Sequence, residues 1–186
     1  MRKIILASGS PNRKKILMDA GVDFEIDPSS YEEDMTLPMS PHDLVMHLSH
    51  GKAADVAARH KSGLILGADS IVVYEDQRLG KPRTSERAVE MLKMLSGKQH
   101  QVVTGFTLID LDNNKTLSKA VATEVFFKAL SDQEIEEYVA TGEPLEKAGA
   151  YAIQQNARKF VEKIEGSETN IAGLPIEVLL ETLKEF

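Results

Sequence analysis

The sequence has no cysteine among its 186 residues, which excludes disulfides and thiolate metal sites and suits a reducing compartment such as the cytoplasm. It has no run of 18 apolar residues, and residues 1–10 lack the pattern of a secretory leader, so we expect neither membrane span nor leader. Positive charge is also scarce, because 29 acidic residues outnumber 22 Lys and Arg and give a net charge of −7. A general nucleic-acid binder normally carries the opposite sign. An anionic partner must therefore be small and meet locally clustered cations.

The hydrophobic pattern contains no repeat, low-complexity tract or linker, which favours a single domain over residues 1–186. Helices are predicted at 11–20, 41–59, 85–96, 132–141 and 175–186, most of them opened by a Ser or Thr cap. Strands are predicted at 2–6, 64–66, 71–74, 100–111, 116–127 and 160–164. In the first helix, Ile16, Leu17 and Ala20 form the apolar face and Gly21 ends it. Alternating helices and strands followed by a long hairpin predict an α/β fold with a mixed sheet.

Two serines, a glycine and a proline separate the first predicted strand from the first helix. Ser10 is expected to cap that helix, with Pro11 at its first position. Arg13, Lys14 and Lys15 then oppose the helix dipole, at about 0.3–1 kcal/mol each when exposed. A bound phosphate would reverse that sign, because free N–H groups at a helix start attract anions. The alternative is an ordinary turn with a basic, solvated first helical turn.

Lys52 and Asp69 are charged residues in apolar patterns. Position 52 falls on the apolar stripe of its helix, four residues after Leu48 and four before Val56. Its ammonium either reaches to the rim or meets an anion in a cleft. Asp69 stands between two predicted strands, where it is either paired, metal-bound or protonated, or else a turn aspartate that bonds its own backbone.

Three further candidates are ambiguous when taken singly. Glu33 lies in a loop with three consecutive acids, which suits Mg²⁺ but also an ordinary solvated surface. Lys81 stands at a rigid turn before a proline. Gln154 ends a small-residue stretch, 147–154, that could read a base edge or form only a tight connection. A Walker loop and zinc-ligand spacing of histidines are both absent.

Several ordered motifs run through the chain. They are Ser8-Gly9-Ser10-Pro11 with Arg13, Gly67-Ala68-Asp69-Ser70, Gly80-Lys81-Pro82, Leu95-Ser96-Gly97, His100-Gln101-Val102-Val103-Thr104-Gly105, Lys147-Ala148-Gly149-Ala150-Tyr151 with Ile153-Gln154, and Gly173-Leu174-Pro175. Together they resemble the Maf family of nucleoside triphosphate pyrophosphatases, nearly from end to end. The first stretch alone is also similar to the strand–loop of sugar nucleotidyltransferases.

The Maf resemblance implies an inosine-triphosphatase-like α/β fold, with a mixed twisted sheet, flanking helices and two lobes around a cleft, often as a homodimer. It implies hydrolysis of a nucleoside triphosphate to the monophosphate and pyrophosphate, with Mg²⁺ or another divalent cation such as Mn²⁺. Asp69 matches the catalytic aspartate, described as the proton acceptor. The other matched positions are Ser8, Ser10, Arg13, Glu33, Lys52 and Lys81 for phosphate and metal handling, and Asn12, Ser70 and Gln154 for substrate choice. We therefore expect Asp69, Lys52 and Lys81 to be catalytic and Glu33 and Asp69 to hold the metal, which leaves open whether Asp69 acts as base, as metal ligand or as both.

Substrate preference is expected to be dTTP or UTP, including modified pyrimidine nucleotides. Members with that preference commonly have Arg where this chain has Asn12, Thr where it has Ser70, and Gly-Ile-Gln-Gly where it has Ala-Ile-Gln-Gln around Gln154. The 7-methyl-GTP group is a poorer match, because it carries Trp, Gln and Glu at the corresponding positions. Two other functions stay open: a nucleotidyltransferase that needs an acceptor, and a non-catalytic nucleotide-binding regulator of septation.

Overall fold

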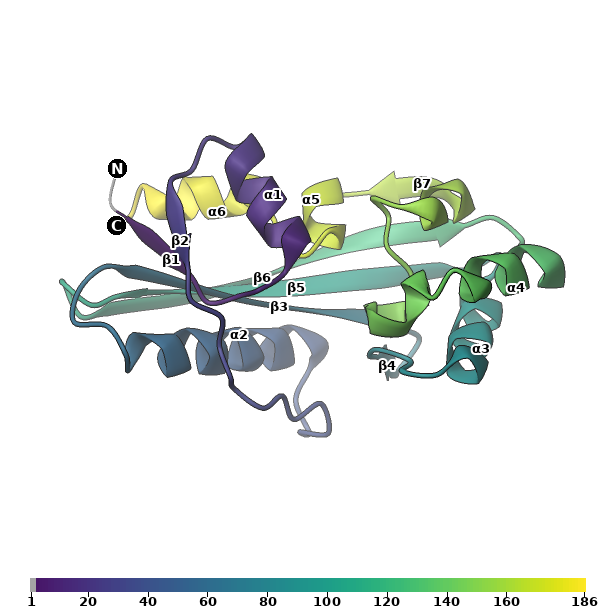
Figure 1. The fold of residues 1–186 in the computed structure, drawn as a ribbon, viewed down its shortest axis with the longest axis horizontal. Helices are drawn as coiled ribbons and strands as arrows, with labels where there is room; N and C mark the ends of the chain where they lie inside the picture. The colour runs from purple at the N-terminus through teal and green to yellow at the C-terminus, as the bar shows by residue number, and fades with distance from the viewer. Residues whose placement is uncertain (1–2) are drawn as a thin grey trace. The chain divides into compact units, whose positions relative to one another are not determined.

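The structure, a computed structural model, describes residues 3–186 (Figure 1). Its strands are β1 (Ile4–Leu6), β2 (Phe24–Ile26), β3 (Leu64–Tyr74), β4 (Gln77–Leu79), β5 (Gln99–Asp110), β6 (Lys115–Phe127) and β7 (Val161–Glu165). Its α-helices are α1 (Pro11–Asp19), α2 (Pro41–Ala57), α3 (Ser85–Leu95), α4 (Asp132–Ala140), α5 (Glu168–Ile171) and α6 (Ile176–Leu183). Short 3₁₀ turns are η1 (Glu143–Glu146), η2 (Ala148–Ala150) and η3 (Asn156–Phe160).

The strands form one mixed sheet in the order β2-β1-β3-β5-β6-β7, with β4 paired to β3. Strand β1 is parallel to both neighbours, pairing Ile4 with Phe24 on β2 and with Leu64 on β3. The β3–β4 and β6–β7 pairs are antiparallel. Parallel pairs near the N-terminus and antiparallel pairs after them confirm the predicted α/β class.

The chain divides into two compact units. Unit 1 comprises residues 3–69, 104–121 and 173–186 of the described chain, and unit 2 comprises residues 70–103 and 122–172. Within unit 1, α2 covers one face of the sheet while α1 and α6 lie on the other (Figure 1). A buried cluster joins α2 to β1 and β3 through Ile5, Ala7, Ala53, Val56 and Ile65.

Two glycines let α2 lie directly against the strands. A Cβ on Gly67 of β3 would lie 2.7 Å from the backbone nitrogen of Ala53, and one on Gly105 of β5 would lie 2.8 Å from that of Met46. Both distances are shorter than real Cβ atoms tolerate, so any side chain there must push the helix away. Asp69 is two residues beyond Gly67 and therefore shares its face of β3. This close approach brings a residue of α2 within reach of Asp69.

Substituting Gly67→Ala should therefore destabilise the protein. Overpacking a well-packed contact typically costs about 1–3 kcal/mol, and here the opposing atoms are backbone. The change in free energy of unfolding can be measured by urea denaturation. Gly80→Ala is the control, because a Cβ there meets no atom within 4 Å. Equal stabilities for the two variants would contradict this account of how α2 packs.

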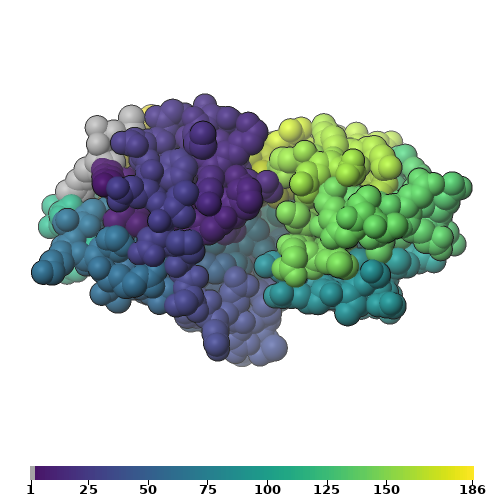
Figure 2. Space-filling view, viewed as in Figure 1, coloured from purple at the N-terminus to yellow at the C-terminus, as the bar shows by residue number. Residues whose placement is uncertain are grey.

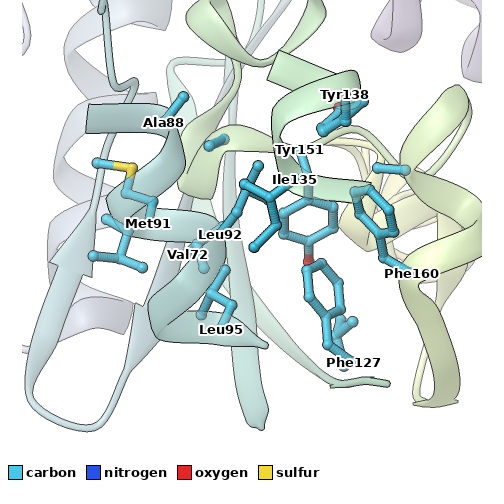
Figure 3. Packing of buried hydrophobic residues seen from close by; sticks show 14 of the residues in the cluster. Val72, Ala88, Met91, Leu92, Leu95, Phe127, Ile135, Tyr138, Tyr151 and Phe160 are labelled. Atoms are coloured by element: carbon cyan, nitrogen blue, oxygen red, sulfur yellow. The ribbon is translucent and has the colours of Figure 1, made fainter. Parts of the chain in front are cut away.

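Unit 2 has its own core, beneath α3 and α4. It includes Val72, Met91, Phe127, Tyr138 and Phe160 (Figure 3). The ring of Phe127 meets that of Tyr151 edge-on, with centroids 4.9 Å apart. Such edge-to-face pairs are favourable for aromatic rings. Unit 2 therefore has a buried apolar core of its own.

Most predicted elements are confirmed to within a few residues. The predicted break at 67–70 is wrong, because β3 runs unbroken from Leu64 to Tyr74 and its small residues make room for α2 instead of a turn. Ala20, predicted on a buried face, is exposed because α1 ends one residue earlier. Strands β2 and β4 and helix α5 were not predicted. The predicted first residue of β1, Arg2, lies outside the described residues.

Candidate active site

A buried ion pair joins α2 to β3 inside unit 1. Lys52 Nζ donates a hydrogen bond to Asp69 Oδ1 at 2.5 Å, and the two side chains are 11% and 7% exposed. The same ammonium lies 2.6 Å from Glu33 Oε1, in the segment between β2 and α2. Lys52 therefore meets anions and does not reach outward to the rim. Asp69 is paired within a strand, so the turn-aspartate alternative is wrong.

The environment of Asp69 changes its proton affinity. Burial raises the pKa of the Asp69 carboxyl above its ordinary value, and the negative charge of Glu33 acts in the same direction. The positive charges of Lys52 and Arg13, and the hydrogen bond from Lys52, offset part of that rise. A carboxylate in this setting is a stronger base than one in water.

Arg13 is held at the start of α1 by groups from both ends of the chain. Its Nη1 donates to Ser8 Oγ at 3.0 Å and its Nε to the carbonyl oxygen of Gly173 at 2.8 Å. Ser10 caps the helix as predicted, accepting from the Arg13 N–H. Burial lowers the pKa of the Arg13 guanidinium, while Asp69 and Glu33 act to raise it. Those two carboxylates are therefore close enough to act on Arg13 electrostatically, and an arginine stays protonated in proteins.

The charges of this cluster cancel. Arg13 and Lys52 supply two positive charges, and Glu33 and Asp69 supply two negative ones. Lys15 of the first helical turn contributes differently, because it pairs with Asp19 one turn later on the exposed side. A polyphosphate entering the cluster would thus gain strong attraction only if further positive charge came with it.

Three predicted site residues belong to unit 2. Ser70 is half-buried on β3, directly after Asp69. Lys81 is exposed and lies 3.6 Å from Glu146 Oε2. Gln154 is exposed, just after the 3₁₀ turn η2. Their roles stay predictions, as does that of Asn12, which is half-buried on α1.

Within residues 3–186, no three or more His, Asp or Glu side chains gather as a ready-made metal site. Over that same range, none of the helices is both long and apolar enough to cross a membrane.

The family model described as Maf-like protein matches residues 3–186. The chain belongs to the Maf family. The resemblance read from the motifs is therefore confirmed.

Curated relatives match over the full chain. A protein of Bacillus cereus strain AH820 is 50% identical over 186 residues, covering 100% of this chain and 96% of the relative. One of Bacillus mycoides strain KBAB4 is 48% identical over the same coverage. Both are named dTTP/UTP pyrophosphatase. Among solved structures, the Ham1 protein of Staphylococcus aureus aligns over 98% of both chains with a TM-score of 0.48 and 16% identity.

The structure also adds residues that sequence reasoning missed. Tyr31 packs on Gly51 beside Lys52, and Asp55 of α2 accepts hydrogen bonds from the segment that carries Glu33. The one available signal was the spacing of Asp55, three residues after Lys52 and so on a neighbouring part of the helix surface. Its hydrogen-bond partners, Ser29 and Ser30, lie in an irregular segment, whose sequence has no periodic pattern from which the contact could be predicted.

Proposed function

We propose that this chain hydrolyses a nucleoside triphosphate to the monophosphate and pyrophosphate, with dTTP and UTP preferred. One observation carries the proposal: Arg13 and Lys52, from different elements, gather with Glu33 and Asp69 in one cluster. Membership of the Maf family supports the same activity, as does the name of its relatives, dTTP/UTP pyrophosphatase.

The cationic side chains and the N-terminal end of α1 are proposed to bind the phosphates. Arg13 is preorganised by Ser8 and Gly173, so little freedom is lost when it contacts phosphate oxygens. The N–H groups at the start of α1 favour an anion there, and the hydroxyls of Ser8 and Ser10 lie beside them. Lys81 is proposed as a further phosphate contact on the strength of its matched motif.

Asp69 is proposed as the general base. It takes a proton from the water that attacks the α-phosphorus, as the α–β anhydride bond breaks and pyrophosphate leaves. The raised pKa of Asp69 favours that proton transfer, and Lys52 keeps the carboxylate oriented.

The donor set fits a divalent cation, and we propose Mg²⁺. Glu33 and Asp69 each have one carboxylate oxygen in contact with the ammonium of Lys52, so the two carboxylates lie close together. Magnesium typically binds through one or two carboxylates together with waters and substrate phosphates. When bound, it supplies positive charge to the phosphate oxygens. Because the formal charges of Arg13, Lys52, Glu33 and Asp69 cancel, such a contribution would strengthen the attraction of the cluster for a polyphosphate.

Substrate choice is proposed to rest on Asn12, Ser70 and Gln154, the positions that match the specificity residues of the family. Loss of the family arginine at Asn12 removes one cation near the nucleotide. The cytoplasmic location and the homodimer stay predictions.

A pyrophosphate-release panel tests the proposal. The purified protein is incubated with Mg²⁺ and one of dTTP, UTP, CTP, 5-methyl-UTP, pseudo-UTP, GTP or 7-methyl-GTP. We expect release from dTTP and UTP without any acceptor, and none when a chelator removes Mg²⁺. Preferential activity on 7-methyl-GTP would contradict the substrate preference but not the chemistry.

The two alternative functions give different outcomes in the same panel. A nucleotidyltransferase would release pyrophosphate only when an acceptor such as a sugar phosphate is added. A non-catalytic regulator would bind nucleotide saturably and form no product. Either outcome would overturn the proposal.

A further inference from the structure

The segment 27–40 between β2 and α2 has no regular structure over most of its length, yet it carries Glu33 to Lys52. It forms part of the surface of unit 1, where it is coloured indigo (Figure 2). A segment of this kind would normally have many conformations, so placing one carboxylate on one ammonium requires anchors. The segment is anchored by contacts with α2.

Asp55 is the first anchor. Its Oδ2 accepts from Ser29 Oγ at 2.8 Å and from the backbone N–H of Ser30 at 2.9 Å. These bonds lower the pKa of the Asp55 carboxyl, the contact from Ser29 contributing most. Arg59, one turn later, donates to both Asp55 and Asp27 and so ties the beginning of the segment to the same helix.

Tyr31 is the second anchor. Its ring lies flat against the backbone of α2 at Gly51, where a Cβ would come within 2.6 Å of the ring atoms Cε1 and Cε2. Only glycine leaves room for the ring at that distance. Ser29 also accepts from the Tyr31 N–H at 3.0 Å, so the two anchors are linked.

Both anchor contacts are made on α2 close to Lys52. Gly51 precedes Lys52 directly and Asp55 follows it by three residues, which puts Asp55 about one turn away on the same side. Glu33 comes two residues after Tyr31 in the segment. Once the segment is fixed at Ser30 and Tyr31, little chain remains before Glu33, and its carboxylate lies within reach of Lys52.

We propose that Asp55 and Tyr31 are positioning residues of the active site, which hold segment 29–33 on α2 so that Glu33 meets Lys52 and Asp69. This inference rests on the proposed function, in which Glu33 helps to hold the divalent cation. Neither side chain is proposed to touch substrate. Their effect is to keep one acidic oxygen in place before the cation and nucleotide arrive.

Asp55→Ala is the first test. Hydrogen exchange of residues 29–33, measured on the protein alone, should become at least about tenfold faster because the Ser30 N–H loses its acceptor. The Mg²⁺ concentration that gives half-maximal pyrophosphate release should rise about 10–100-fold, as is usual when a ligand loses its support. Asp55→Asn keeps an acceptor oxygen and should restore most of both properties.

A double-substitution cycle separates positioning from a general structural role. If Asp55 acts through Glu33, Asp55→Ala should add nothing further to the Mg²⁺ requirement once Glu33→Gln is present. Gly51→Ala, which displaces the Tyr31 ring, should reproduce the Asp55→Ala effect. Tyr31→Phe keeps the ring on Gly51 and loses only the exposed contact of the hydroxyl with His47 Nε2, so its effect should be smaller. Glu25→Ala, an exposed acid on β2, is the matched control and should change neither property.

Two results would overturn the inference. One is faster exchange in Asp55→Ala with an unchanged Mg²⁺ requirement. The other is that Asp55→Ala raises the Mg²⁺ requirement by the same factor whether or not Glu33→Gln is also present. If the parent protein releases no pyrophosphate from any nucleotide, the proposed function fails instead, and Mn²⁺ titration followed by electron paramagnetic resonance decides on the anchors. Weaker Mn²⁺ binding in Asp55→Ala would then support positioning, and equal binding would refute it.

Discussion

Asp69→Asn should lower kcat for pyrophosphate release at least about a hundredfold, within the range that general-base catalysis supplies. The asparagine keeps the shape of the side chain and one acceptor oxygen for Lys52, so the fold is expected to persist. It removes both the negative charge and the capacity to take a proton. Initial rates at saturating dTTP and Mg²⁺, together with a urea unfolding curve, measure the two effects separately.

Asp110→Asn is a suitable control for that experiment. Asp110 is as buried as Asp69 and belongs to the same unit, but its carboxylate accepts from Asp112 and Asn113 in the β5–β6 turn. Its substitution should lower stability and leave kcat close to that of the parent protein. Near-normal turnover in Asp69→Asn would exclude that residue as the base, whatever its other contacts.

The elements that local rules govern could be predicted from the sequence. Ser10, Ser40, Thr84 and Ser131 each cap a helix and accept the expected backbone hydrogen bond. Ser131 and Glu134 form the predicted capping box. A helix cap depends on residues within one turn of each other, so a few consecutive residues of the sequence are enough to predict it.

The side-chain contacts within the site could not be predicted from such local patterns. The apolar stripe placed Lys52 on the buried face of its helix but left open whether its ammonium reaches to the rim or meets an anion. Its partners could not be predicted, because Asp69 is 17 residues away and Glu33 is on an irregular segment. The small residues at 67–70 predicted a break between two strands. In the structure the strand continues, and the missing side chain of Gly67 lets the backbone of α2 pack closely against it. Both facts depend on how elements pack, which no local pattern contains.

Lys52→Met should destabilise the protein in a pH-dependent way. The methionine fills a similar volume but leaves the buried carboxylate of Asp69 without its ammonium, and removing one partner of a buried pair typically costs about 3–5 kcal/mol. Arg13 remains and offsets part of that cost. Lys184→Met, which breaks an exposed pair with Glu181, should cause no measurable change and serves as the control.

The direction of the pH dependence follows from the raised pKa of Asp69. A carboxyl whose pKa is higher in the folded than in the unfolded state binds more protons when folded, so stability falls as pH rises through the folded-state pKa. Loss of Lys52 raises that pKa further and extends the fall to higher pH. The loss in free energy of unfolding that Lys52→Met causes should therefore be largest at about pH 8. It should shrink towards about pH 5, because protonation of Asp69 removes the unpaired charge. A deficit that is constant with pH in urea unfolding would mean that Lys52 stabilises the fold through packing and not by neutralising Asp69.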